Sequence, residues 1–378
     1  MHMQCVVEKN VKKAAQSTAL CVFVFLLFHA AMAQDAAQGA LQLCVSVIVP
    51  SLFPFMVISS LMVRCGALSF LGRPLAPITK RLLRLPGCAA GAVILGALCG
   101  FPVGAKTACE LYENRFLTKR QTERLIAIAN NTGPAFIAEV IGAHFWGSRG
   151  LGIAVYLLQI LTALLIGAVY ARLSPAPAGG KADTDTRPLR RAPEDLLHGL
   201  SASVSCAAQS SLTVCGFIVF FAVILELCGH ALASVGLGAL VPYAAALTEF
   251  SSGAAASAAV GGTAGAFLCG FTVGWSGLSV FAQCRSFTAE HGISLRPAAL
   301  CKCIQGILCG IGTAVYFRLF ADGGIGGYTG VFGVGDGPAP YPAAGMPVHQ
   351  AMVYGELLGL ILFCLMPFFT EKLYRKKS

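Results

Sequence analysis

The sequence predicts an all-α, polytopic membrane protein with two related halves. Of its 378 residues, 56% are hydrophobic and only 12% are charged, and the mean hydropathy is +0.73. Several apolar runs reach the roughly 18–20 residues that a bilayer-spanning helix needs. A heptapeptide, Leu-Cys-Gly-Phe-x-Val-Gly, occurs at residues 98–104 and again at residues 268–274. This repetition indicates an internal duplication and predicts two repeats.

The charge and the cysteines have ordinary explanations in a membrane protein. The net charge of +10 does not indicate nucleic acid, because the Lys and Arg residues cluster beside apolar spans, as the positive-inside rule describes. Most of the 16 cysteines lie inside apolar runs, and no Cys-x-x-Cys pair occurs. We therefore expect the lipid bilayer as a partner, no nucleic acid, no metal and no cofactor.

Residues 1–39 form a basic segment and a first membrane helix. The apolar stretch 18–33 ends in Ala31-Met32-Ala33, which resembles a signal-peptidase site, so a cleaved signal is an open alternative. The next apolar stretch follows almost at once, which favours a retained helix.

Residues 40–173 form the first repeat. A span at 41–63 contains Pro50 and Pro54, and a basic amphipathic segment at 68–85 is typical of the membrane interface or the top of a bundle. A half-length apolar segment at 87–98 leads to the first heptapeptide. The charges of residues 106–131 predict a helical segment with a solvated face, in which Thr118 caps a helix that ends at Asn130-Asn131. A second half-length segment at 134–146 and a full span at 151–171 complete the repeat.

Residues 174–196, rich in Pro, Gly and Ala and then in mixed charge, form a linker to the second repeat at 197–320. That repeat has a long span at 200–228, a weakly amphipathic stretch at 231–247 and a small-residue segment at 251–268. A break at 270–277 and a span at 298–320 follow. Residues 321–378 comprise a Gly/Pro-rich external loop, a last membrane helix at 351–369 and a basic tail.

The distribution of Lys and Arg predicts the orientation. Both termini and the linker are basic, so all three are expected in the cytoplasm. Equivalent helices would then enter the two halves from opposite sides, which predicts inverted repeats with broken or re-entrant helices. The basic stretch 115–124 conflicts with strict inversion unless the helices there are re-entrant.

The two heptapeptides are the first candidate site. Broken helices can expose backbone amides and dipole ends to a polar ligand, although a Gly/Pro kink used only for packing is the alternative. The residues concerned are Gly100, Phe101, Pro102 and Gly104 in the first copy, and Gly270, Phe271, Thr272 and Gly274 in the second.

Six other residues are candidate ligands of a solute. Lys106 follows the first copy but would equally snorkel to headgroups, and Ser276 follows the second copy. The amides and hydroxyl of Asn130, Asn131 and Thr132 suit a nucleobase or sugar, or they cap a helix. Glu249 lies between apolar segments without a nearby cation in sequence. An acid at membrane depth is a functional candidate, whereas at the interface it would be ordinary.

Enzyme motifs are weak in this sequence. Gly333-Val334-Gly335-Asp336 matches the Gly-x-Gly-Asp of intramembrane aspartyl proteases, but it lies in a Pro/Gly loop. There is no His-Glu-x-x-His, P-loop or Gly-x-Ser-x-Gly sequence. We therefore expect no catalytic residues and no enzymatic activity.

Three stretches carry a resemblance to a known family. Ser51-Leu52-Phe53-Pro54-Phe55, the run Gly100 to Lys106 and the run Leu125 to Pro134 resemble the YlbJ-type sporulation integral membrane proteins, within the nucleoside-recognition (Gate) superfamily. The segment from Thr248 to Gly253 is similar to the Leu-Glu-x-x-x-Gly segment of that family, with Thr before the Glu. The long loop at 322–348 departs from the commoner family form.

The resemblance implies a Gate-type helical fold, a multi-pass protein of the bacterial inner membrane, and a role in endospore formation linked to the spore cortex. Transport of a small polar solute, such as a nucleoside-like compound or an ion, is the favoured activity. A non-transporting scaffold for cortex-assembly proteins is the alternative, with sporulation proteins as partners.

Overall fold

A computed structural model describes residues 16–174 and 196–320, apart from residues 18 and 21. Within these residues every regular element is a helix, which confirms the predicted all-α fold. The start of the chain, nearly all of the linker, the 322–348 loop with Gly333–Asp336, the last predicted helix and the basic tail lie outside them.

The first half has longer helices at its two ends and short ones between. A single helical run (α2, η1 and α3) crosses the predicted boundary at residue 39 and contains both Pro50 and Pro54. The elements are α2 (Ala30–Leu43), η1 (Cys44–Ile48), α3 (Val49–Arg64), α4 (Ala67–Gly72), η2 (Arg73–Leu75), α5 (Ala76–Ile78), η3 (Thr79–Leu83), α6 (Ala89–Leu98), α7 (Val103–Glu113), α8 (Lys119–Ala129), η4 (Phe136–Phe145) and α9 (Arg149–Leu173).

The second half opens with a helix of 39 residues. The predicted segment 251–268 is divided between two helices at Gly261, whose positive φ of 66° ends the first of them. The elements are α10 (Leu196–Ser234), η5 (Gly238–Leu240), α11 (Val241–Thr248), α12 (Phe250–Val260), α13 (Gly262–Trp275), α14 (Leu278–Thr288) and α15 (Arg296–Phe320).

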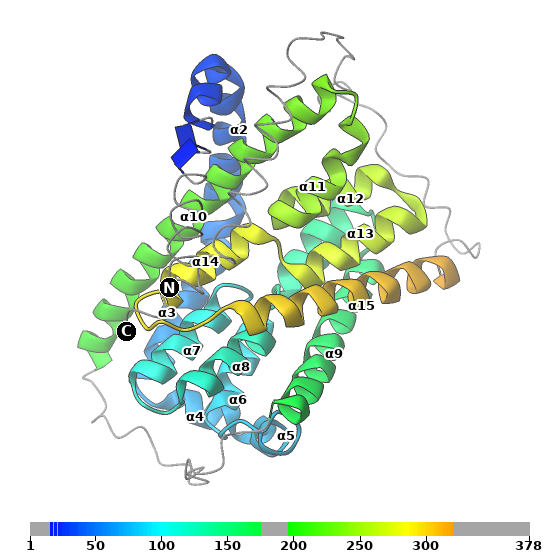
Figure 1. The fold of residues 1–378 in the computed structure, drawn as a ribbon. Helices are drawn as coiled ribbons and strands as arrows, with labels where there is room; N and C mark the ends of the chain where they lie inside the picture. The colour runs from blue at the N-terminus through cyan, green and yellow to red at the C-terminus, as the bar shows by residue number, and fades with distance from the viewer. Residues whose placement is uncertain (1–15, 18, 21, 175–195, 321–378) are drawn as a thin grey trace, which may run out of the picture.

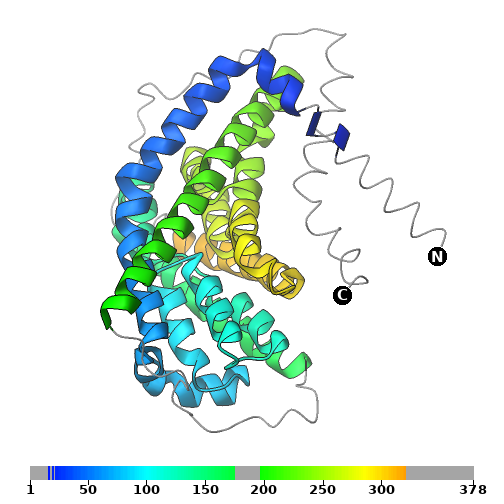
Figure 2. The same ribbon diagram turned by 90° about the vertical axis from the view of Figure 1, so that its left-hand side faces the viewer.

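The helices of the two halves pack into one bundle. α10 lies along α2 and α3, and α15 packs along α13 and crosses α9 (Figures 1 and 2). The short helices α4 to α8 gather at one end of the molecule, whereas α11 to α13 lie toward the other end (Figure 1). The inverted relation of the repeats and the cytoplasmic position of the linker stay predictions.

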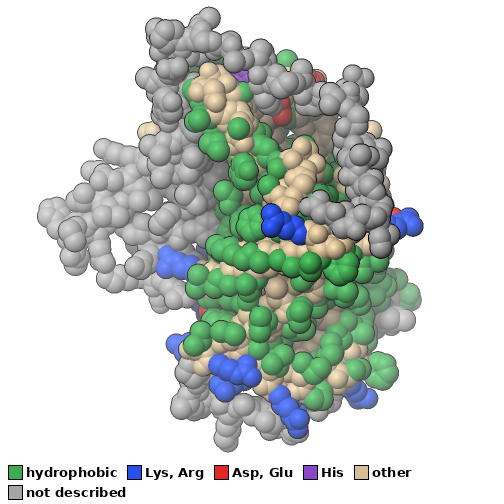
Figure 3. Space-filling view, turned by 90° about the vertical axis from the view of Figure 1, so that its right-hand side faces the viewer, with side chains coloured by type: hydrophobic (Ala, Val, Ile, Leu, Met, Phe, Trp, Pro, Cys, Tyr) green, Lys and Arg blue, Asp and Glu red, His purple; other side chains and the backbone are tan. Residues whose placement is uncertain are grey.

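Within the described residues, four helical segments are long and apolar enough to cross a membrane. They are Arg149–Leu173, Leu197–Ser234, Gly262–Thr288 and Arg296–Phe320. On α9, Ile153, Leu157, Leu161 and Leu165 are exposed at a spacing of four residues, which forms an apolar face suited to lipid. Apolar side chains also dominate the face in Figure 3, and many of its Lys and Arg residues lie near its lower end.

The second heptapeptide itself does not break its helix, and the break predicted at 270–277 lies at the far end of that range, at Ser276-Gly277. In the first copy, α6 ends at Leu98 and α7 begins at Val103, because Pro102 has no backbone N–H to continue the helical ladder. In the second copy Thr272 keeps that N–H, and its hydroxyl donates to the Leu268 carbonyl at 2.8 Å. α13 therefore runs through Gly270 and Gly274 and ends at Trp275, followed by Ser276 and Gly277.

The helix predicted after Thr118 is confirmed, and its predicted solvated face is wrong at Glu123 and Arg124, although Arg120 is exposed. Thr118 and Gln121 form a reciprocal capping box, and α8 ends before Asn130. Glu123 and Arg124 are nevertheless only 8% and 6% exposed. Glu123 accepts from the Ser294 amide at 3.0 Å, and Arg124 donates to the backbone carbonyl of Arg84 at 3.4 Å. Distant segments of the chain therefore cover this face.

Candidate functional site

The first heptapeptide positions a second break, which separates α8 from η4. Gly100 has a positive φ of 82°, and a side chain there would come within 2.9 Å of the Gly133 amide nitrogen. A methyl group on Gly96 or on Gly104 would overlap the carbonyl oxygen of Ala129, the last residue of α8. Only glycine allows α6, α7 and the end of α8 to come so close. The glycines thus fix where Asn130, Asn131 and Thr132 lie.

These three residues are buried, and two glutamines from other helices hold Asn131 and Thr132. Both backbone polar groups of Thr132 bond to the Gln159 side chain on α9, at 3.1 Å for the Thr132 amide and 3.0 Å for its carbonyl. The Asn131 amide group donates to the Ile128 carbonyl at 2.7 Å, and Gln305 on α15 donates to the Asn131 Oδ1 at 3.3 Å. Side chains from α9 and α15 therefore hold the break between α8 and η4 in place inside the bundle.

A lysine that the sequence analysis did not select completes this cluster. The Lys302 side chain, on α15, is 1% exposed, and its Nζ donates to the Asn131 Oδ1 at 2.9 Å. No carboxylate in the described part of the chain forms an ion pair with it. A lysine inside an apolar span was the signal that could have found it, because charges at membrane depth are costly. We call Asn131, Gln159, Lys302 and Gln305 the central cluster.

Some polar atoms of the break have no hydrogen-bond partner within the described residues. They are the Asn130 Oδ1 and the Thr132 Oγ1, both buried. A buried polar group without a partner costs about 1–3 kcal/mol. The break can therefore accept a hydrogen bond from a ligand at Asn130 and exchange one at Thr132.

A polar cavity of about 450 Å³ lies between α3, α7, α10 and α14. Lys106 lines it, is 5% exposed, and has an Nζ without a hydrogen-bond partner in the described part of the chain. Glu110, one turn further along α7, lines the same cavity and accepts from Ser60 at 3.5 Å. The other ionisable and polar lining residues include Arg64, Glu113, Gln209, Ser210, Thr213, Glu290 and His291.

The electrostatics of the cavity are mixed. α7 lies outside the four candidate spans, and burial there raises the pKa of the Glu110 carboxyl, while the nearby Lys106 and Arg64 cations oppose this rise. The His291 Nε2 and the Glu113 Oε1 lie 2.8 Å apart at the more exposed edge of the cavity. The cavity can therefore bind a solute through both donors and acceptors.

Glu249 is buried, 3% exposed, at the junction of α11 and α12, where it caps α12. Its Oε2 accepts from the Ser252 amide at 2.7 Å and from the Ser251 hydroxyl at 2.6 Å. The structure therefore gives this carboxylate a capping role. Glu249 does not pair with Lys106, the buried lysine of the first half, because the Lys106 Nζ has no hydrogen-bond partner within the described residues.

The second heptapeptide packs α13 against α15. Side chains at Gly270 and Gly274 would come within 2.5 Å of the Cys309 carbonyl oxygen and 2.7 Å of the Gln305 carbonyl oxygen. Phe271 contacts Gly306, and Ser276 is 1% exposed with an unpartnered hydroxyl in the described chain. This copy therefore holds the helix that carries Lys302 and Gln305, and it offers no open helix end at Gly270.

Aromatic rings connect the two halves beside the first break. Phe250, the first residue of α12, meets Phe101 edge to face with ring centroids 5.0 Å apart. It also meets Phe136 of η4 at 5.3 Å. Phe101 therefore serves as a contact between halves, and its ring is partly buried against the core.

The fold and these buried polar groups define a multi-pass α-helical membrane protein. Residues 45–169 match the family model described as Gate, nucleoside recognition. The chain is also similar to the sporulation integral membrane protein YlbJ of Bacillus subtilis (strain 168), with 26% identity over 329 residues, which cover 76% of this chain and 79% of that protein. No solved structure matches. These findings confirm the resemblance that the sequence predicted.

Proposed function

We propose that this protein acts in endospore formation and moves a small polar solute across its membrane. The sporulation role is inferred from the similarity to the Bacillus protein. The transport role is inferred from the polar cavity, because an apolar bundle has no structural need for a buried cation such as Lys106 beside an open space. The proposal assigns no catalytic step.

The dimensions and chemistry of the cavity limit the solute. Its volume of about 450 Å³ lies in the range of small-molecule sites. Lys106 and Arg64 would donate to acceptors on the solute, while Glu110, Gln209 and Ser210 would accept from its donors. A nucleoside-like compound or a small ion with its hydration shell fits these limits, and the Gate description of the matching family supports the first of these.

Uptake into proteoliposomes tests this proposal. The purified chain is reconstituted, and nucleosides, inorganic ions and cell-wall precursors are offered in turn. Accumulation of one class above protein-free vesicles is the expected result. If no class of solute accumulates while Lys106→Met or Glu249→Gln still impairs spore formation, the protein acts as a scaffold and the transport proposal is wrong.

Lys106→Met is expected to weaken solute binding. A hydrogen bond to a charged group contributes about 1.5–3 kcal/mol, so the apparent affinity in uptake should fall about 10- to 100-fold. Methionine keeps the length and removes a buried charge, so abundance should not fall. Lys119→Met, at the start of α8, is the matched control. Equal uptake constants for both variants would place Lys106 outside the binding site.

Glu249→Gln is expected to abolish the sporulation function at normal abundance. The glutamine carbonyl oxygen can still accept from the Ser252 amide, so the cap of α12 is kept while the negative charge is lost. Membrane abundance and the yield of heat-resistant spores are the measurements. Glu139→Gln, which changes an exposed carboxylate paired with Arg149, is the control. Spore yields at the wild-type level would leave Glu249 with its capping role alone.

A further inference from the structure

One face of α14 carries a row of polar residues that leads away from the cavity. Ser279, Gln283 and Ser286 follow one another at spacings of four and three residues, which places them on the same side of the helix. Ser286 lines the cavity. Ser279 and Gln283 lie further inside, at 0% and 2% exposure. We call these three residues, together with Ser276 just before the helix, the α14 stripe.

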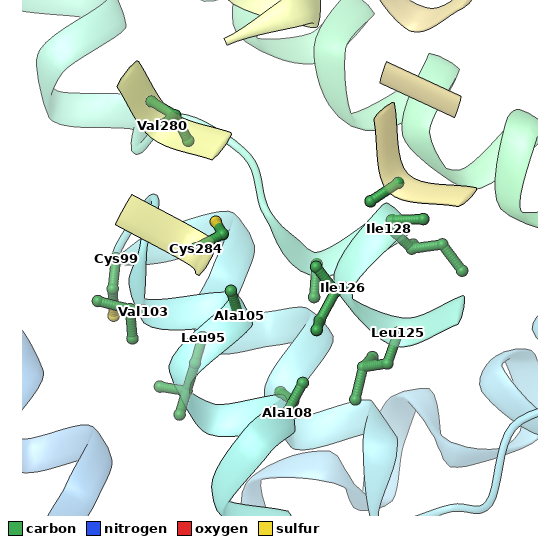
Figure 4. Close-up of a cluster of buried hydrophobic side chains, with 14 of the residues drawn as sticks. Leu95, Cys99, Val103, Ala105, Ala108, Leu125, Ile126, Ile128, Val280 and Cys284 are labelled. Carbon is green, nitrogen blue, oxygen red and sulfur yellow. The ribbon is translucent and has the colours of Figure 1, made fainter. Parts of the chain in front are cut away.

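The neighbouring face of the same helix is apolar and closely packed. Val280 and Cys284 lie in a cluster with Cys99, Val103 and Ala105 (Figure 4). Each is 1% exposed. The buried surface of α14 is therefore divided into a polar face and an apolar face, although core packing alone requires only apolar residues.

The stripe contains unpartnered polar atoms over consecutive turns. The hydroxyls of Ser276 and Ser279 and the Oε1 of Gln283 have no hydrogen-bond partner within the described residues. Each such group costs about 1–3 kcal/mol when buried, and three of them in one row are an expensive arrangement for a purely structural helix. The stripe can accept a hydrogen bond at every turn.

The far end of the stripe reaches the junction that holds Glu249. A side chain at Gly277 would come within 3.1 Å of the Phe250 amide nitrogen and 3.2 Å of the Thr248 carbonyl oxygen. The Trp275 indole donates to the Leu247 carbonyl at 2.9 Å. The stripe therefore extends from the cavity at Ser286 to the junction of α11 and α12.

We propose that the α14 stripe is the wall of the path along which the solute moves between the cavity and the Glu249 junction. This inference rests on the proposed transport function. The free atoms are neutral and include the Gln283 Oε1, which only accepts, so the passing part of the solute carries hydroxyl or N–H donors. A row of acceptors exchanges one hydrogen bond for the next as such a solute advances.

Thiol labelling tests the path without any transport measurement. Ser279→Cys, Gln283→Cys and Val280→Cys are each made in the full chain and reconstituted, and a small water-soluble methanethiosulfonate is added. Modification is read for each site by peptide mass spectrometry, with the native Cys284 as an internal reference. We expect Ser279→Cys and Gln283→Cys to react at least about tenfold faster than Val280→Cys, because only they face the path. Equal rates at all three positions would overturn the proposal.

Gln283→Leu supplies the second test. Leucine has a similar size and removes the unpartnered amide, so thermal stability should stay the same or rise while uptake is lost. A clear loss of stability would make Gln283 a structural residue and contradict the path. If the wild-type protein takes up none of the solutes offered, the transport proposal fails, and the labelling rates still decide whether the stripe faces an open path.

Discussion

Lys302→Met is expected to abolish function while the protein accumulates and folds normally. The Lys302 side chain is buried among helices, and its Nζ donates to the neutral oxygen of Asn131. A lysine inside a membrane helix is costly, and the cost reaches roughly 2.5–3.5 kcal/mol at the helix centre on insertion scales. Methionine removes that cost and keeps the shape of the side chain. Thermal unfolding in detergent should therefore occur at the same or a higher temperature.

The loss of function has a geometric reason. The Lys302 Nζ uses one N–H for Asn131, so it both fixes the break after α8 and has further N–H to offer to a polar ligand. Spore yield and solute uptake are the measurements, and Lys80→Met on the exposed basic segment is the control. Wild-type yields for Lys302→Met would show that the central cluster is not part of the site.

A substitution of Asn131, the acceptor of the Lys302 hydrogen bond, tests whether this bond contributes to stability. Asn131→Leu removes the acceptor of the buried Lys302 Nζ and is expected to lower stability, since a buried polar group without a partner is costly. Combining it with Lys302→Met should restore stability, because the two residues are in contact and their effects do not add. A double variant that is no more stable than Asn131→Leu alone would contradict the pairing.

Gly96→Ala is expected to cause the largest loss of folded protein. Alanine is normally preferred to glycine inside a helix by about 0.5–1 kcal/mol. At Gly96, however, the added methyl would overlap the Ala129 carbonyl oxygen and lie 2.7 Å from its carbon. Backbone atoms cannot rotate away, so α6 and α8 must separate, and overpacking of this kind costs at least about 1–3 kcal/mol.

Gly216→Ala is the matched control for this prediction. Gly216 lies within α10, and a methyl group there meets nothing within 4 Å. Membrane abundance and the elution profile after detergent extraction are compared for the two variants. We expect Gly216→Ala to match the wild-type protein and Gly96→Ala to aggregate or be degraded. Equal behaviour would mean that α6 and α8 can separate without consequence.

Local signals in the sequence predicted several elements correctly. The capping box at Thr118 and the end of α8 before Asn130 depend on residues a few positions apart, and both are confirmed. The spans at 151–171 and 298–320 follow from apolar length and correspond to α9 and α15. Such features are readable because their physical cause lies within one segment.

Features that depend on distant partners were not predictable in this way. The charges of Glu123 and Arg124 indicated a solvated face, but the Ser294 amide, 171 residues away from Glu123, covers it. The two heptapeptides looked equivalent, although one substitution, Pro102 against Thr272, decides whether the helix ends. Lys302 lay in a span that was assigned by length alone, and its bond to Asn131 joins residues from different halves.

The contact between Phe250 and Phe101 limits how the two halves can move. Phe250 belongs to the second half, whereas Phe101 and Phe136, which both touch it, belong to the first. Aromatic pairs of this kind contribute about 0.5–1.5 kcal/mol beyond their buried area. A rocking motion that keeps these rings together would pivot about Phe250. The residues farthest from Phe250 would then move the greatest distance, whereas the break beside Phe101 would stay almost still.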